Sequence, residues 1–232
     1  MTTYWLKFTL LSDATFGRGD GVAGLVDAEV QHDEAGLPYL GGKTLKGLLG
    51  AECAEILFAL RQNPTRDMDK WESTAAQLFG QPGSGNKETG MMHVGDACLP
   101  KPLRAAVWAE FAGLDDAARG EFRRITLESL TALRRQTAMD AVSGAPLKNS
   151  LRTMRVIVRE TPFEAELTLL NEIQLPQQAL LAACVRAFRR AGSGRNRGRG
   201  RVHADIYNQY PADGMKPVTD QWFAQFQREV QS

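Results

Sequence analysis

The stretch 191-AGSGRNRGRGRV-202 joins the end of a predicted helix to the start of a predicted strand. Residues 176–190 have apolar side chains at helical spacing, with a proline near the start and Gly192 just past the end. Residues 202–207 alternate as a strand does. Within the stretch, glycines let the backbone approach a ligand closely, and alternating arginines supply charge and planar hydrogen-bond donors. We therefore expect a structured, anion-binding loop.

Two familiar glycine-rich motifs fit this loop less well. A dinucleotide fingerprint would need a third glycine where Arg197 stands, and it would have to follow a strand, not a helix. A disordered arginine–glycine tail conflicts with the regular elements predicted on both sides. A solvated basic turn stays open as the simpler alternative.

The composition is that of an ordinary globular chain, with 232 residues, of which 43% are hydrophobic and 24% charged. Seven arginines lie between residues 186 and 201 without one acid, and removing them from the net charge of +1 leaves −6. This local basic element on an acidic body indicates anion recognition.

Three widely separated cysteines predict neither disulfides nor a zinc site. The absence of leader and membrane-spanning patterns predicts a soluble cytoplasmic protein.

Outside the loop, the periodicity of apolar residues predicts an alternation of strands and helices. Strands are expected over residues 4–11, 91–99 and 155–170, the last hinged near Pro162, and helices over residues 43–61, 115–135 and 219–230. Without insertions, the order is strand, helix, strand, strand, helix, strand. This is the ferredoxin-like order of the α+β class, in which helices cover one face of an antiparallel sheet.

The stretch 36-GLPYLGGKTLKG-47 opens the first predicted helix. It is not a P-loop, because Gly36 lies one residue too far from Gly42 for the Walker spacing. The free N–H groups of a helix start, together with Lys43 and Lys46, still favour an anionic partner. The simpler alternative is an ordinary helix with Thr44 as its N-cap.

These two stretches, together with 90-GMMHVGDACLP-100, resemble the RAMP superfamily (repeat-associated mysterious proteins) of CRISPR–Cas effectors. More narrowly, the chain resembles backbone subunits that polymerise along CRISPR RNA in type III and related complexes. The resemblance implies a single RAMP domain over residues 1–232 with a ferredoxin-like, RRM-related core. It also implies a small helical insertion at about 62–90 and a thumb-like hairpin at about 133–156. The implied partners are CRISPR RNA, complementary target RNA, further copies of the chain and other effector subunits, but no membrane and no ATP.

In catalytic members of this family, a loop before the first helix presents an aspartate to the target RNA. Asp27, in 24-GLVDAEV-30, falls at the corresponding place. The resemblance therefore implies a metal-dependent endoribonuclease in which Asp27 holds Mg²⁺ or another divalent metal, or orients the 2′-hydroxyl for attack on the phosphate. Asp20 and Asp33 are neighbouring alternatives, His32 is a candidate acid or base, and a structural carboxylate is the simpler role for Asp27.

The resemblance also implies an RNA-binding set on three elements and a wedge that separates guide from target. The RNA-binding residues are Lys43, Thr44, Lys46, Gly194, Arg195, Arg197, Arg199, Arg201, Arg134, Arg135, Lys148 and Arg152, and the wedge residues are Met139 and Val142. A plain helix–hairpin connection is the alternative for the thumb.

Two departures from the family keep further functions open. The helix start reads Gly-Gly-Lys-Thr where many relatives have Pro-Gly-Ser-Ser, which places more weight on Lys43. The compact length also suits a non-catalytic backbone or capping subunit with an inert Asp27. A transcript-processing endonuclease is a further alternative, for which His32, His93 and His203 are the available histidines.

Overall fold

The structure is a computed structural model, and it describes residues 1–19, 21, 26–62, 67–81, 90–140, 143–147, 150–194 and 197–231. Arg195, Lys148, Val142 and Asp20, which the sequence pattern singled out, lie outside the described residues.

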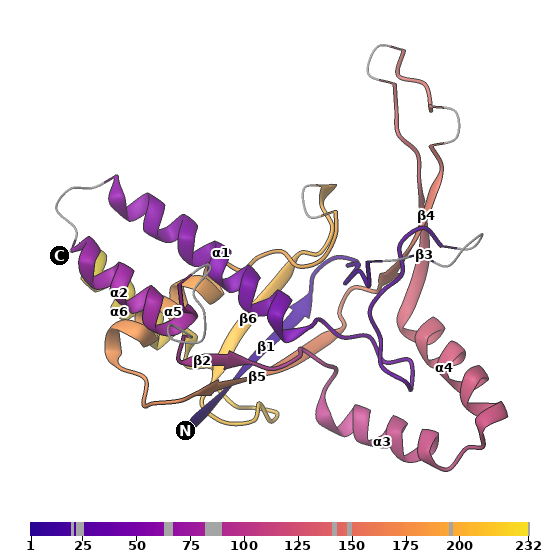
Figure 1. The fold of residues 1–232 in the computed structure, drawn as a ribbon, viewed down its shortest axis with the longest axis horizontal. Coiled ribbons are helices and arrows are strands. Elements are labelled where there is room, and N and C mark those ends of the chain that lie inside the picture. The colour runs from indigo at the N-terminus through magenta and orange to yellow at the C-terminus, as the bar shows by residue number, and fades with distance from the viewer. Residues whose placement is uncertain are drawn as a thin grey trace.

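A four-stranded antiparallel sheet forms the centre of the protein (Figure 1). Strand β1 (Thr2–Leu10) pairs on one side with β5 (Pro162–Leu169) and on the other with β6 (Val202–Tyr207), while β2 (Met92–Val94) pairs with the outer edge of β5. Helices α1 (Gly42–Arg61) and α5 (Leu175–Ala187) connect these strands. The order β2-β5-β1-β6 confirms the predicted ferredoxin-like α+β fold.

The core lies between the sheet and its helical layer. Alternate residues of β1, including Leu6, Phe8 and Leu10, are fully buried on the helical side. The Phe8 ring stacks on Phe163 with centroids 5.3 Å apart and meets Phe188, beyond α5, edge to face at 5.8 Å. Because every second side chain of β1 points to the same face, that face packs against the helices while the two edges of the strand pair with β5 and β6.

The remaining helices extend this framework at two places. Helices α2 (Met68–Phe79) and α6 (Thr219–Gln231) pack with α5, so that α1, α2, α5 and α6 gather at one end of the molecule (Figure 1). Helices α3 (Lys101–Ala112) and α4 (Asp116–Leu130) form a separate arm beyond β2. No helix among the described residues is long and apolar enough to cross a membrane. The three cysteines are free thiols.

The sequence-based boundaries were wrong at two places. The helix expected over residues 115–135 ends at Leu130, because Thr131 Oγ1 donates to the Leu127 carbonyl at 2.6 Å and residues from Thr131 onward join a strand ladder. The strand expected over residues 91–99 is only three residues long, and beyond it Ala97 and Cys98 make single bridges. Helix α3 was not predicted, because Phe111 is the one residue in it that is buried.

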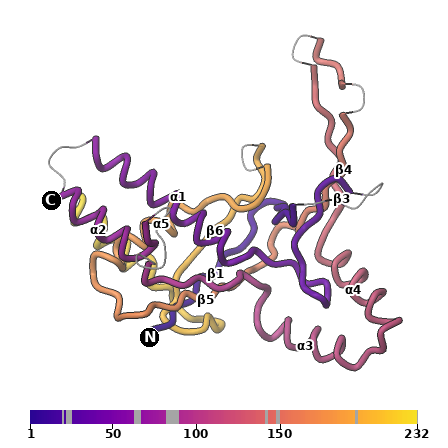
Figure 2. The backbone as a smooth tube through the Cα atoms, in the orientation of Figure 1, coloured from indigo at the N-terminus to yellow at the C-terminus, as the bar shows by residue number. Residues whose placement is uncertain are grey.

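A β-hairpin of β3 (Thr131–Gln136) and β4 (Arg152–Ile157) stands away from the sheet (Figure 2). Its register runs from Thr131 opposite Ile157 to Gln136 opposite Arg152. The hairpin and the loop between α5 and β6 project toward the same side of the molecule (Figure 2).

A buried ion pair joins the hairpin to the segment that precedes α1. Arg155 Nε donates to both oxygens of Glu29, at 2.9 and 3.2 Å, and the two side chains are only 10% and 5% exposed. Arg155 Nη1 donates to Thr131 Oγ1 at 3.2 Å, and the Arg155 carbonyl accepts from Thr15 Oγ1 at 2.9 Å. Arg155 of β4 therefore contacts three other segments of the chain: the one after β1, the one before α1, and the start of β3.

Breaking this pair should destabilise the protein strongly. Glu29→Gln leaves the Arg155 guanidinium buried without a counter-charge, and we expect the free energy of unfolding in urea to fall by about 3–5 kcal/mol. Glu72→Gln is the matched control, since it breaks the exposed pair with Arg61 at 2.8 Å and should cost less than about 1 kcal/mol. Equal losses in the two variants would contradict the role given to Glu29.

Candidate nucleic-acid interface

The loop of residues 188–201, which we call the glycine–arginine loop, is anchored along its length to the segment that follows β1. The Ser193 backbone N–H donates to the Thr15 carbonyl at 2.8 Å, and the Gly200 N–H donates to the Asp13 carbonyl at 2.9 Å. Ser12 Oγ donates to the Gly198 carbonyl at 3.2 Å. The described part of the loop is therefore held in a defined position, which confirms a structured loop.

Its glycines serve two different purposes. Gly192 and Gly200 have positive φ angles, and a Cβ there would lie 2.5 Å from the Thr15 carbonyl oxygen and 1.9 Å from the Ala191 carbonyl oxygen. Gly198 also has a positive φ, but a Cβ there would meet nothing within 4 Å. The inner glycines are required by packing, whereas the outer part of the loop leaves its backbone open to a ligand.

The arginines of the loop differ in how freely they can act. Arg197 and Arg201 are exposed, and Arg199 is half-buried, with its guanidinium against the Met154 sulfur of the hairpin. The Gly194 carbonyl accepts a hydrogen bond from the Arg197 N–H at 2.8 Å. The loop thus presents exposed cations at Arg197 and, next to β6, at Arg201, with the partly buried Arg199 between them.

At the start of α1, a carboxylate of the protein itself occupies the anion-binding position. Asp96 Oδ1 accepts from the Gly42 N–H at 2.7 Å, in the position that a phosphate would take at a helix N-terminus. Thr44 is the third residue of the helix and not its N-cap, which is Gly41. Lys43 is exposed, whereas Lys46 donates to the Met92 carbonyl at 2.8 Å, and burial lowers the pKa of Lys46. Lys43 is therefore the accessible cation of this motif.

On the hairpin, the register decides which arginines act together. Arg134 lies opposite Met154 and Arg152 lies opposite Gln136, so Arg134 and Arg152 share the face that Arg199 contacts, while Arg135 belongs to the other face. Arg134 Nε and Nη2 donate to Asp13 Oδ2 at 3.0 and 2.8 Å. Arg134 is thus paired with a carboxylate, and Arg135 and Arg152 remain as exposed cations.

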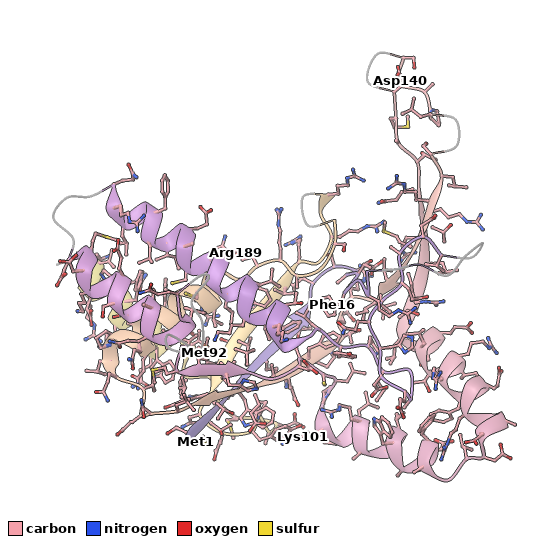
Figure 3. All side chains as sticks on the ribbon, viewed as in Figure 1. Met1, Phe16, Met92, Lys101, Asp140 and Arg189 are labelled. Carbon is pink, nitrogen blue, oxygen red and sulfur yellow. The ribbon has the colours of Figure 1, made fainter. Side chains whose placement is uncertain are left out.

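Toward its far end the hairpin carries an apolar side chain in solvent. Met139 is 56% exposed and forms an isolated bridge with Pro146, and Asp140 follows it at the end of the hairpin (Figure 3). Val142, the other predicted wedge residue, lies outside the described residues. An exposed methionine on a projecting hairpin is the side chain that a wedge between bases would require.

Asp27 lies along the outer edge of β4, beside Thr153 near the start of that strand. Its backbone N–H donates to the Thr153 carbonyl at 2.7 Å, and its Oδ2 accepts from the Thr153 N–H at 2.6 Å. The side chain is exposed, so Oδ1 can face a ligand. Among the described residues, no group of three or more His, Cys, Asp or Glu side chains could hold a metal. Mg²⁺ commonly uses one or two carboxylates and takes its other ligands from phosphate and water, so Asp27 fits such an ion only together with a bound nucleic acid.

Two of the alternatives to Asp27, Asp33 and His32, have partners of their own. Asp33 Oδ1 accepts from the Ala35 and Leu37 N–H groups at 3.1 and 2.9 Å, and its Oδ2 accepts from Trp108 Nε1 at 3.1 Å. His32 Nδ1 lies 2.9 Å from the Asp33 carbonyl oxygen. Asp33 therefore organises the turn before α1 and its contact with α3.

The open face of the sheet mixes acids and cations, unlike the loop side. Lys7 lies between Glu164 on β5 and Asp205 on β6, and Trp5 lies opposite Glu166. Asp205 also pairs with Arg186 of α5 at 3.0 Å, and Lys101 sits 4.2 Å from the centroid of the Trp5 ring. The cations of this face are thus matched by acids, so the basic surface of the loop and hairpin is the better candidate interface for a phosphate backbone.

Two residues of this surface, Asp13 and Arg159, were not found by sequence reasoning. Asp13 pairs with Arg134 across 121 positions of sequence, and its Oδ1 accepts from the Arg159 N–H at 3.2 Å. Neither residue lies in a motif, so no local signal marks them.

The fold and this surface define an α+β protein with a ferredoxin-like core and a basic loop-and-hairpin side. The profile of the RAMP superfamily matches residues 7–203, and the chain belongs to that superfamily. No curated protein matches the sequence.

Two solved structures have a similar fold. One is described as a cryo-EM structure of the type III-B Cmr-beta bound to cognate target RNA; it has a TM-score of 0.60 and 14% identity, over 89% of this chain and 97% of the other. The second is the cryo-EM structure of type III-B Cmr-beta in the apo state, with a TM-score of 0.61 and 14% identity over 92% and 99%. At this identity the likeness establishes the shared fold.

The two kinds of glycine should respond differently to substitution. Gly198→Ala adds only the strain of a left-handed backbone, about 1–2 kcal/mol. Gly200→Ala adds the same strain and also a Cβ that overlaps the Ala191 carbonyl. It should therefore lower the midpoint of thermal unfolding more than Gly198→Ala does. It should also speed hydrogen exchange at the Ala191 amide, which donates to the Gly200 carbonyl. If both variants behave alike, the packing role of Gly200 is wrong.

Proposed function

We propose that this chain is an RNA-binding backbone subunit of a type III CRISPR effector and holds the guide RNA along its loop-and-hairpin side. The observation that carries this proposal is the projection of the glycine–arginine loop and the β3–β4 hairpin toward one side, with Arg197, Arg201, Arg135 and Arg152 exposed on them. Membership of the RAMP superfamily and the similar fold in a Cmr-beta structure bound to cognate target RNA support it.

The exposed groups suit the backbone of RNA better than its bases. Guanidinium groups and open glycine backbone bind phosphates without reading sequence, and base pairing between guide and target supplies the specificity. Lys43, at the start of α1, extends the same surface. The partners of this function are CRISPR RNA, complementary target RNA, further copies of the chain and other effector subunits.

We further propose that Asp27 takes part in cleavage of the target RNA. Its free Oδ1 can accept the proton of a 2′-hydroxyl or hold Mg²⁺, while the Thr153 N–H fixes Oδ2. A bound Mg²⁺ would supply charge stabilisation at the phosphate. Attack by the 2′-oxygen on the adjacent phosphate breaks the bond to the 5′-oxygen and leaves a cyclic phosphate.

A non-catalytic backbone or capping subunit is the second candidate, and one observation favours it. One oxygen of Asp27 is already committed to the backbone of β4, and the described residues provide no group of three or more His, Cys, Asp or Glu side chains that could hold a metal. For a transcript-processing endonuclease, His93 and His203 lie on the two opposite edge strands of the sheet, so these two histidines do not converge.

Asp27→Asn is the sharpest test of cleavage. The amide keeps an oxygen for the Thr153 N–H but loses the charge, so the guide-loaded complex should still bind complementary RNA and should lose regularly spaced cuts by about a hundredfold or more. Labelled target RNA with Mg²⁺, and with EDTA as a second control, measures this on denaturing gels. Asp213→Asn, an exposed acid in the loop before α6, should cut normally. Unchanged cutting in Asp27→Asn would assign the chemistry to another residue or subunit.

RNA binding itself should depend steeply on salt. Each phosphate contact contributes about −0.7 to the slope of log K against log salt concentration for a single strand. Replacing Arg197 with alanine should weaken binding by a similar factor for every sequence and reduce the magnitude of that slope by about 0.7. Fluorescence anisotropy of unrelated single-stranded RNAs between low and physiological salt measures both effects. A loss confined to one RNA sequence would contradict backbone recognition.

A further inference from the structure

A pocket of about 590 Å³ lies where the hairpin, the β4–β5 turn and the glycine–arginine loop meet. It is lined by Leu11, Ser12, Asp13, Arg134, Val158, Arg159 and Arg199. Three arginines and one aspartate give its charged lining a formal charge of +2. The pocket is thus a separate cationic feature below the exposed outer end of the loop.

The aspartate serves as the internal counter-ion of this pocket. Asp13 Oδ2 accepts both hydrogen bonds from Arg134, and Oδ1 accepts from the Arg159 N–H. The Asp13 side chain is 22% exposed and that of Arg134 is 52% exposed, so solvent still reaches the pair. Arg159 meets this aspartate through its backbone N–H, and Arg199 lies against the Met154 sulfur. One carboxylate and three arginines therefore line the same pocket.

The walls of the pocket are fixed by the backbone. Glu160, beside Arg159, has a φ of +70°, and its N–H donates to the Leu10 carbonyl at 2.7 Å. On the opposite wall, Ser12 Oγ bonds to Gly198 and accepts from the Arg201 N–H at 3.0 Å. A left-handed glutamate held in this way indicates a turn whose shape the surrounding structure maintains.

We propose that this pocket binds one phosphate of the RNA, and that Asp13 competes with that phosphate for Arg134. Guanidinium groups match phosphate oxygens with paired hydrogen bonds, and three of them around one pocket favour a phosphodiester over a lone carboxylate. In the absence of RNA, Asp13 holds Arg134 at the pocket. When the phosphate enters, Arg134 and Arg159 bind it from the hairpin and from the turn. This inference rests on the proposed RNA-binding function and assigns to it a phosphate site and an internal competitor.

The test compares two substitutions with opposite expected signs. Arg159→Ala removes a ligand of the phosphate, so affinity for a fluorescein-labelled single-stranded RNA should fall by about tenfold, and the salt slope should shrink by about 0.7. Asp13→Asn keeps an oxygen for the Arg159 N–H but releases Arg134, so affinity should rise by about threefold or more. Anisotropy titrations of the full chain at several salt concentrations measure both.

Two controls separate the pocket from general charge effects. Arg228→Ala removes an exposed arginine of α6 and should leave affinity nearly unchanged. Asp213→Asn changes the net charge as Asp13→Asn does, but far from the pocket in sequence and on another loop, and should not tighten binding. If Asp13→Asn and Asp213→Asn behave alike, or if Arg159→Ala matches Arg228→Ala, the pocket assignment is overturned.

The outcomes also distinguish this inference from the proposed function. If wild type binds RNA and Arg197→Ala weakens it while Arg159→Ala does not, the pocket fails and the RNA-binding surface stands. If wild type does not bind RNA even in the guide-loaded complex, both fail. A last experiment measures thermal stabilisation of wild type and of Arg159→Ala by inorganic phosphate. If phosphate stabilises only wild type while wild type and Arg159→Ala bind RNA with equal affinity, the pocket binds a free anion, and the RNA site is overturned.

Discussion

The buried contact between Arg155 and Glu29 is the interaction on which the functional side of the molecule depends. The guanidinium and carboxylate are almost fully removed from water, and they bond the hairpin strand β4 to the segment before α1. Thr131, which also bonds to Arg155, marks the change from α4 to β3. Separating the pair would leave an uncompensated charge away from water, so this contact holds the base of the hairpin to the core. Asp27 lies on the same joined segments, two residues before Glu29.

Around this junction the protein distributes its charges differently on two sides. The open face of the sheet carries Glu164, Glu166 and Asp205 around Lys7, whereas arginines occupy the loop and hairpin. In an RRM-like fold the open sheet face is a natural place for stacked bases, but here the cations of that face are already matched by acids, which weakens its attraction for a phosphate backbone. The chain therefore places its cationic groups on the connections at one end of the sheet.

Sequence reasoning identified what depends on local periodicity and failed where distant residues decide the structure. The core strands, α1 and α5, and the glycine–arginine loop all carry their own pattern, and the fold class followed from their order. The end of α4 was missed because Thr131 is drawn into a ladder with Ile157, a partner far away in sequence. Two further features were missed for the same reason: Arg134 pairs with Asp13, and Asp96 accepts a hydrogen bond at the start of α1. Both contacts join residues that only the folded chain brings together.

The central claim is that RNA lies along the loop-and-hairpin side. Cross-linking of the guide-loaded complex with RNA that carries 4-thiouridine, followed by peptide mass spectrometry, tests it most directly. We predict cross-links concentrated in residues 189–201 and 131–157, with residues 2–10 and 162–169 of the sheet essentially free of them. Cross-links concentrated on those sheet strands would show that RNA follows the open face, and they would contradict the placement of RNA on the loop and hairpin.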